Sequence, residues 1–150
     1  MTAPTPATGL YKRILLVVDL SEDSRTVGAR ARAVAAACGA ELQLLHVVEY
    51  LPVEPLGETL LPSVEIEEEL IRRAGERLRG LARDLGLADA QCRVESGNTK
   101  AEIVRAAIDT AADLIVLGSR ERHGLSILIN QTEDTVLHAA HCDVLAVRLK

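Results

Sequence analysis

The chain has 150 residues, of which 48% are hydrophobic, and a formal net charge of −5 at pH 7. This length fits one domain with a sizeable core, and the negative charge argues against nucleic acid as a partner. The sequence has no Phe or Trp, so it lacks the aromatic platforms on which single-stranded bases stack. No apolar run approaches the ~18 residues that a membrane span needs.

The first residues and the cysteines bear on location. Residues 1–9 are rich in Pro, Thr and Ala and lack the basic start and long apolar stretch of a signal peptide. We therefore expect a short flexible tail, followed by a single domain over residues 10–150. Cys38, Cys92 and Cys142 are scattered, and no CxxC pair occurs. This spacing is typical of reduced thiols and predicts a cytoplasmic protein.

The first part of the domain alternates strand and helix. Residues 12–18 are predicted to form a strand whose continuous apolar run, 14–18, is typical of a strand covered on both faces. Ser21 is expected to cap a helix with apolar residues near helical spacing, and Gly39 to stop it. Residues 41–48 are predicted to form the second strand.

The middle of the chain continues the alternation. Residues 50–62 contain three prolines and a glycine and predict a long loop. A long amphipathic helix over 63–85 has early acids, later arginines and an apolar stripe (Ile66, Leu70, Ile71, Ala74, Leu78, Leu81 and Leu85). Residues 91–95 give a weak strand signal. A capping box that begins at Thr99 opens a helix to about residue 110.

The last part of the chain contains the pattern that bears most directly on function. Residues 114–117 form an apolar strand that ends abruptly in Gly118 and Ser119; a helix over 130–140 and a last strand over 144–149 follow. Such alternation predicts an α/β domain with a parallel sheet and helices on both faces. In open sheets of this kind, ligands bind at the carboxyl ends of the strands.

Several motifs, in their order and spacing, resemble those of the universal stress proteins over nearly the whole chain. They are the strand and acidic turn of 11–21, LLHVV at 44–48, GNTKAEIV at 97–104, LGS at 117–119 and CDVLAV at 142–147. The resemblance implies a single-domain, flavodoxin-like (Rossmann-like) three-layer sandwich with five parallel strands in the order 3-2-1-4-5. In that order, Asp19 and Gly118 face each other across a crevice between the first and fourth strands.

The resemblance also implies a set of nucleotide-binding residues. Asp19 would face the adenosine, and the backbone of Val47 would meet the adenine. The remaining members of the implied set are Gly97, Gly118, Ser119 and Thr132. Each has a structural alternative: Asp19 as a turn residue that caps the first helix, Val47 as core, the glycines as strand-to-loop turns, and Thr132 as a helix N-cap.

The phosphate loop departs from the family's ATP-binding pattern, G-x2-G-x9-G-(S/T). Gly118 and Thr132 match it, but Glu121 and Gln131 replace two glycines. Side chains at these positions resist positive φ and hinder the approach of backbone to phosphate. Nearby acids add repulsion (Glu121, Glu133 and Asp134), which is partly offset by cations (Arg120, Arg122 and Lys100). The chain therefore resembles the branch typified by universal stress protein A, which lacks the ATP loop.

Two other chemistries find little support. His138, His141 and Cys142 are metal-ligand types near a helix end, but no fourth ligand is evident, so no metal is predicted. Ser126 and His123 lie in one segment without a predicted acid or oxyanion hole, and no G-x-S-x-G elbow occurs. A small hydrolase is accordingly the least favoured of the three functions that the sequence suggests.

The sequence predicts a non-catalytic stress-response protein of the cytoplasm. It identifies no definite cofactor. The apolar last strand would be an unpaired sheet edge, and the family pairs such edges across a two-fold axis, so we expect a homodimer with further, unidentified protein partners. The alternative is a regulatory switch that retains AMP or ATP in the crevice despite the altered loop.

Overall fold

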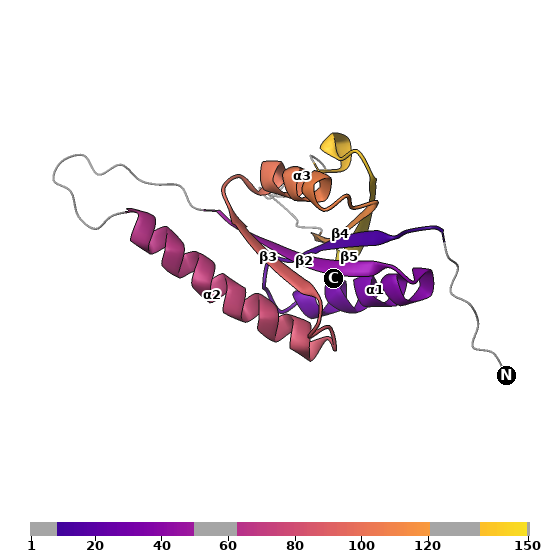
Figure 1. Ribbon diagram of the computed structural model, residues 1–150, viewed down its shortest axis with the longest axis horizontal. Helices are drawn as coiled ribbons and strands as arrows, with labels where there is room; N and C mark the ends of the chain where they lie inside the picture. Colours follow the sequence, from indigo (N-terminus) through magenta and orange to yellow (C-terminus); the bar gives the residue numbers. More distant parts are fainter. Residues whose placement is uncertain (1–8, 50–62, 121–135, 150) are drawn as a thin grey trace.

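A five-stranded sheet forms the centre of the fold in the computed structural model, which describes residues 9–49, 63–120 and 136–149 (Figure 1). The strands are β1 (Arg13–Val17), β2 (Glu41–Val48), β3 (Gln91–Ser96), β4 (Leu114–Arg120) and β5 (Asp143–Leu149). Their order is β3-β2-β1-β4-β5, and every neighbouring pair is parallel. The α/β class and the strand order implied by the resemblance are thus confirmed.

Helices cover both faces of this sheet. They are α1 (Ser24–Cys38), α2 (Ser63–Asp84) and α3 (Thr99–Asp109), and residues 136–139 are also helical. Figure 1 shows α1 and α2 on one face and α3 with the later helical turn on the other. Among the helices in the described ranges, none combines the length and apolar character of a membrane-spanning segment.

The core lies in two layers, one on each side of the sheet. Leu16 and Val116 pack with Val27 of α1 on one face, while Leu15 packs with Ile103 of α3 on the other. Because successive strand residues point to opposite faces, a strand buried on both sides needs an unbroken apolar run. This requirement explains the apolar run that the sequence shows over 14–18.

The predicted cap of the first helix is wrong. Helix α1 begins at Ser24, three residues after Ser21, and Asp23 occupies the N-cap position without a side-chain hydrogen bond to the helix backbone. Ser21 instead uses its backbone: its N–H donates to the Asp19 carboxylate at 2.9 Å, and its carbonyl accepts the Ser24 N–H at 3.0 Å. The predicted stop is confirmed, because Gly39 takes a left-handed conformation with φ of 64°.

The predicted cap of α3 is wrong by one residue. The Asn98 side chain caps the helix by accepting the Ala101 N–H at 3.0 Å. The hydroxyl of Thr99 donates instead to the carboxylate of Glu49, at the end of β2. The entry to α3 is therefore tied to the strand that forms the neighbouring wall of the crevice.

The apolar stripe predicted along α2 is buried only in part. Leu78 and Leu81 pack into the core, whereas Ile66 and Leu70 in the first turns are exposed. Figure 1 shows these first turns projecting beyond the strands. The helix is thus longer than the sheet surface available to cover its apolar face.

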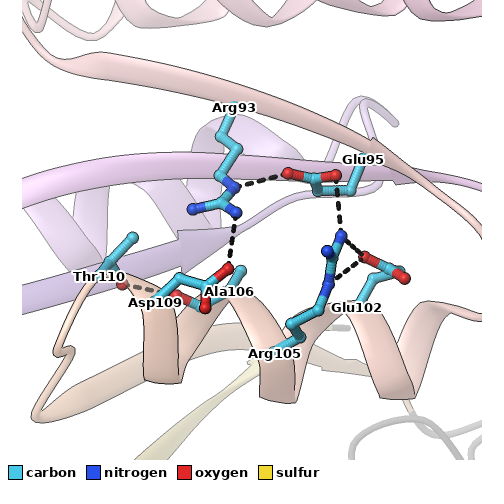
Figure 2. A network of polar contacts seen from close by, with 7 residues as sticks. All are labelled: Arg93, Glu95, Glu102, Arg105, Ala106, Asp109 and Thr110. Atoms are coloured by element: carbon cyan, nitrogen blue, oxygen red, sulfur yellow. Dashed lines mark hydrogen bonds and ion pairs between the residues drawn. The ribbon is translucent and has the colours of Figure 1, made fainter.

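A network of ion pairs joins the edge strand β3 to α3 (Figure 2). Arg93 Nε lies 2.7 Å from the Glu95 carboxylate, and Arg93 Nη2 lies 3.0 Å from that of Asp109 on α3. Arg105 of α3 reaches back to Glu95 at 3.0 Å and also pairs with Glu102. The network fixes α3, whose first residues line a crevice at the carboxyl ends of β1 and β4.

Candidate functional site

A cavity of about 520 Å³ opens at the carboxyl ends of β1 and β4. From β1, the chain adds β2 and β3 on one side of the sheet and then β4 and β5 on the other side. The strand order therefore reverses between β1 and β4. Crevices at such a switch point are the usual ligand sites of open α/β sheets. The volume also lies within the range of roughly 300–1,000 Å³ that is typical of small-molecule sites.

Asp19 lies on the turn after β1 and lines this cavity. Its carboxylate accepts hydrogen bonds from the Ser21 N–H at 2.9 Å and the Ser24 hydroxyl at 3.1 Å. Burial raises the pKa of Asp19, but the hydrogen bonds from Ser21 and Ser24 and the nearby Arg120 guanidinium outweigh it, so the pKa is lowered overall. The group is therefore an ionised acceptor at neutral pH, suited to bind hydroxyl donors.

The end of β2 forms a second wall. Val47 is buried and lines the cavity, as does His46 beside it. The Nδ1 atom of His46 lies 2.8 Å from the Val18 carbonyl oxygen. Since a carbonyl oxygen only accepts hydrogen bonds, Nδ1 must carry the hydrogen. Nε2 is then the ring nitrogen that takes no part in this hydrogen bond. Sequence reasoning missed His46, although a histidine within an otherwise apolar strand is a readable signal.

Gly118 lines the cavity from within β4, where it pairs with Val147 of β5. The strand predicted from the sequence ends at Leu117, and that boundary is wrong, since β4 continues to Arg120. A Cβ on Gly118 would lie 2.9 Å from Leu149 Cδ1 and 3.1 Å from Val27 Cγ2. Its glycine identity therefore permits close packing of β4 against α1 and β5, rather than a turn.

The other residues of the implied nucleotide set are placed differently. Gly97 follows β3, and its N–H donates to the Val48 carbonyl at 3.0 Å; neither Gly97 nor Ser119 is among the residues lining the cavity. Thr132 lies outside the described residues, as do Glu121 and Gln131. The structure thus brings Asp19, Val47 and Gly118 together at one crevice.

The charges around the crevice are mostly acidic. Within the described part of the chain, the lining includes Asp19, Asp23 and Glu49 but only one arginine, Arg120. Arg120 forms an ion pair with Asp23, which also lines the cavity. An anionic ligand would therefore meet few unpaired positive groups on these walls.

A second cavity, of about 650 Å³, lies at the other end of the sheet. Its lining includes Gly39, Leu42, Asp89 and Gln91, at the amino ends of β2 and β3. The larger volume does not make it the better candidate, because ligands in open α/β sheets bind at the carboxyl ends of the strands.

The cysteines and the histidines near β5 show no metal centre in the regions that the structure describes, where no three His, Cys, Asp or Glu side chains gather closely enough to hold an ion. Cys38, Cys92 and Cys142 are free thiols. Burial raises the pKa of the Cys142 thiol, and the same effect raises that of Cys92. Both thiols are therefore in their unreactive, protonated form at neutral pH.

Comparisons with known proteins agree with this architecture. The model of the universal stress protein family matches residues 10–148. Universal stress protein A homolog 2 of Coxiella burnetii is 36% identical over 141 residues, which cover 93% of this chain and 97% of that protein. Homolog 1 of the same organism is 37% identical, with 93% and 98% covered.

Solved structures show the same fold. A universal stress protein crystallised in complex with cAMP is 26% identical, with a TM-score of 0.62, and the match covers 91% of this chain and 96% of the other. Universal stress protein UspA from Lactobacillus plantarum is 22% identical, with a TM-score of 0.72 and coverage of 94% and 100%. The second likeness concerns the fold alone.

Proposed function

Because the chain belongs to the universal stress protein family, we propose that it is a non-catalytic stress-response protein that binds an adenine nucleotide in the crevice between β1 and β4. The observation that carries the proposal is the open cavity with an ionised Asp19 on one wall and Val47 on another. Asp19 would accept hydrogen bonds from the ribose hydroxyls, and Val47 would meet the base. A relative crystallised with cAMP supports this choice of ligand.

The phosphate side of the site favours nucleotides with few charges. Glu121 and Gln131 stand where the ATP-binding pattern has glycines, and the sole arginine of the described lining is already paired with Asp23. Neither feature compensates the three or four negative charges of ATP. We therefore propose that AMP or cAMP binds more tightly than ATP.

The test is a calorimetric titration of nucleotide-stripped protein with AMP, cAMP and ATP–Mg²⁺. Micromolar binding of AMP or cAMP is expected, with weaker binding of ATP. Asp19→Ala should weaken AMP binding about tenfold or more, the usual cost of losing hydrogen bonds to a charged acceptor. Asp89→Ala removes one carboxylate at the second cavity and should have no effect. No heat at millimolar nucleotide would reject the proposal in favour of a protein-binding module that works without nucleotide.

The non-catalytic part of the proposal is tested separately. In the described lining of the crevice, the Ser24 hydroxyl donates to the Asp19 carboxylate at 3.1 Å and His46 Nδ1 lies 2.8 Å from the Val18 carbonyl oxygen, so these two residues are not arranged as a serine–histidine pair. Incubation with ATP should release no phosphate above the buffer rate. Turnover that is lost in Asp19→Ala would instead indicate an enzyme.

The proposal includes a homodimer in the cytoplasm, paired through β5. Strand β5 is an edge of the sheet, and it carries partly buried Val144 and Leu145 and exposed Ala146. An unpaired edge is prone to association, and a two-fold axis along it would close the contact. The three free cysteines are consistent with a reducing compartment.

A further inference from the structure

We propose that Arg77 of α2 is a positioning residue for the crevice: by holding the Leu20 carbonyl, it keeps the turn after β1 in the conformation in which Asp19 lines the cavity. The inference rests on the proposed nucleotide site and adds to it a residue outside the cavity lining. Three observations carry it: a strained turn, a hydrogen bond across elements, and a rigid helix from which that bond is made.

The strained turn lies directly beside Asp19. Leu20 has a φ of 62°, in the left-handed region that leucine rarely adopts and glycine enters freely. The next residue, Ser21, donates its N–H to the Asp19 carboxylate at 2.9 Å. If Leu20 relaxed to a negative φ, the Ser21 N–H would turn away from Asp19, and the carboxylate would lose a hydrogen bond that fixes its direction.

The hydrogen bond across elements comes from α2. Arg77 Nη2 donates to the Leu20 carbonyl oxygen at 2.7 Å. A bond from a guanidinium is charge-assisted and stronger than one between neutral groups. It fixes the peptide that follows Leu20, which is the same peptide that carries the Ser21 N–H. Strained conformations persist only where the surrounding structure holds them, and this bond is such a restraint.

Helix α2 is a rigid base for that bond. Leu78 and Leu81, next to Arg77 and one turn further on, are buried in the core layer on this face of the sheet. The side chain of Leu20 packs against the same layer. The turn is therefore joined to α2 in two ways: Leu20 packs against the same core layer as the helix, and Arg77 adds a hydrogen bond.

The chain offers two matched controls. Arg79, on the same helix, has no hydrogen bond or ion pair with another residue in the described ranges, so Arg79→Met removes equal charge without touching the turn. Arg25 of α1 pairs with Asp84 of α2 at 2.9 Å. Arg25→Met therefore loosens the contact between the two helices while leaving Leu20 and its bond to Arg77 in place.

The experiment compares Arg77→Met with both controls and with Leu20→Gly. One readout is the pKa of the Asp19 carboxyl group, measured by NMR without ligand; the other is the affinity for AMP. Arg77→Met should raise the Asp19 pKa toward its ordinary value of 3.8 and weaken AMP binding about three- to tenfold, the loss of one charge-assisted hydrogen bond. In the Leu20→Gly background, where the turn needs no restraint, both effects of Arg77→Met should largely disappear.

Each outcome decides the matter. The positioning role is overturned if the pKa of Asp19 is unchanged in Arg77→Met or shifts equally in Arg25→Met. It is also overturned if Arg77→Met keeps its full effect in the Leu20→Gly background. If the wild-type protein binds no nucleotide, the proposed function fails. The pKa readout still supports or overturns the role of Arg77 in that case, because it needs no ligand.

Discussion

Gly118 shows how a single missing side chain shapes the crevice. A Cβ there would lie 3.1 Å from Val27 Cγ2, and Val27 is buried in α1. We expect Gly118→Ala to lower the free energy of unfolding by about 1–3 kcal/mol, the usual cost of overpacking. Gly80→Ala is the matched control, because a Cβ on Gly80 in α2 would meet, within the described part of the chain, just the Arg83 guanidinium, at 3.9 Å.

Urea unfolding measures both variants. Gly80→Ala should raise the free energy of unfolding by up to about 1 kcal/mol, since alanine is the better helix former. A Gly118→Ala protein as stable as the wild type would mean that β4 and α1 do not approach as closely as described.

The ionisation of Asp19 predicts a pH-dependent contribution to stability. Because the pKa of Asp19 is lowered in the folded protein, the ionised carboxylate stabilises the fold above the unfolded value of 3.8, and this contribution is lost as the pH falls through and below that value. Asp19→Asn should therefore be less stable than the wild type at pH 7, and the difference should narrow near pH 3. Urea unfolding across this range is the measurement, and a difference that stays constant with pH would contradict it.

Residue patterns identified part of the site and missed the rest for a physical reason. Asp19 and Gly118 stand out because parallel strands bring their carboxyl ends together. Ser21 and Thr99 were wrong as caps, since each makes a different hydrogen bond: Ser21 with Asp19, and Thr99 with the distant Glu49. Contacts of that second kind depend on the fold and cannot be read from local sequence.

At the scale of elements, the ion pairs between β3 and α3 hold one wall of the crevice (Figure 2). Glu95 is their centre, since it accepts from both Arg93 and Arg105. Glu95→Gln should cost less than about 1 kcal/mol of unfolding free energy, because the pairs are partly exposed. The cost should shrink further in 1 M NaCl, where screening extends over only about 3 Å.

Glu76→Gln is the matched control, because Glu76 pairs with Arg72 inside α2 and, among the residues that the structure describes, joins no second element. Unfolding experiments at low and high salt separate the two variants. A salt-independent loss of several kcal/mol in Glu95→Gln would show that packing, rather than charge, joins α3 to β3.

The alternation of elements was readable from the sequence, but their ends were not. The strand predicted at 114–117 continues to Arg120, because pairing of Gly118 with Val147 overrides the weak strand propensity of the Gly-Ser step. The stripe along α2 correctly predicted a helix. The stripe also predicted that its whole length is buried, which is wrong at Ile66 and Leu70, since periodicity does not reveal where the sheet beneath a helix ends.

At the scale of the whole molecule, the free edge at β5 predicts association. Ala146 is exposed on β5, so a two-fold contact along this edge would bring the two copies of residue 146 into one interface. The wild-type protein should sediment as a dimer at micromolar concentration, and Ala146→Lys should shift it toward monomer, because charge on an edge opposes pairing.

Ala101→Lys, an exposed position on α3, is the matched control and should leave the dimer intact. Sedimentation velocity gives the mass of each variant. A wild-type monomer, or equal dissociation in both variants, would reject the β5 interface. The parallel α/β architecture itself followed from the alternation of elements, whereas the strand order came only from the family resemblance.

The most direct test of the nucleotide crevice is amide chemical-shift mapping by NMR during a titration with AMP. Binding in the crevice predicts shifts centred on Asp19, Val47 and Gly118, with Gly39 and Gln91 at the second cavity unchanged. The absence of shifts up to millimolar AMP, or shifts confined to the second cavity, would contradict it.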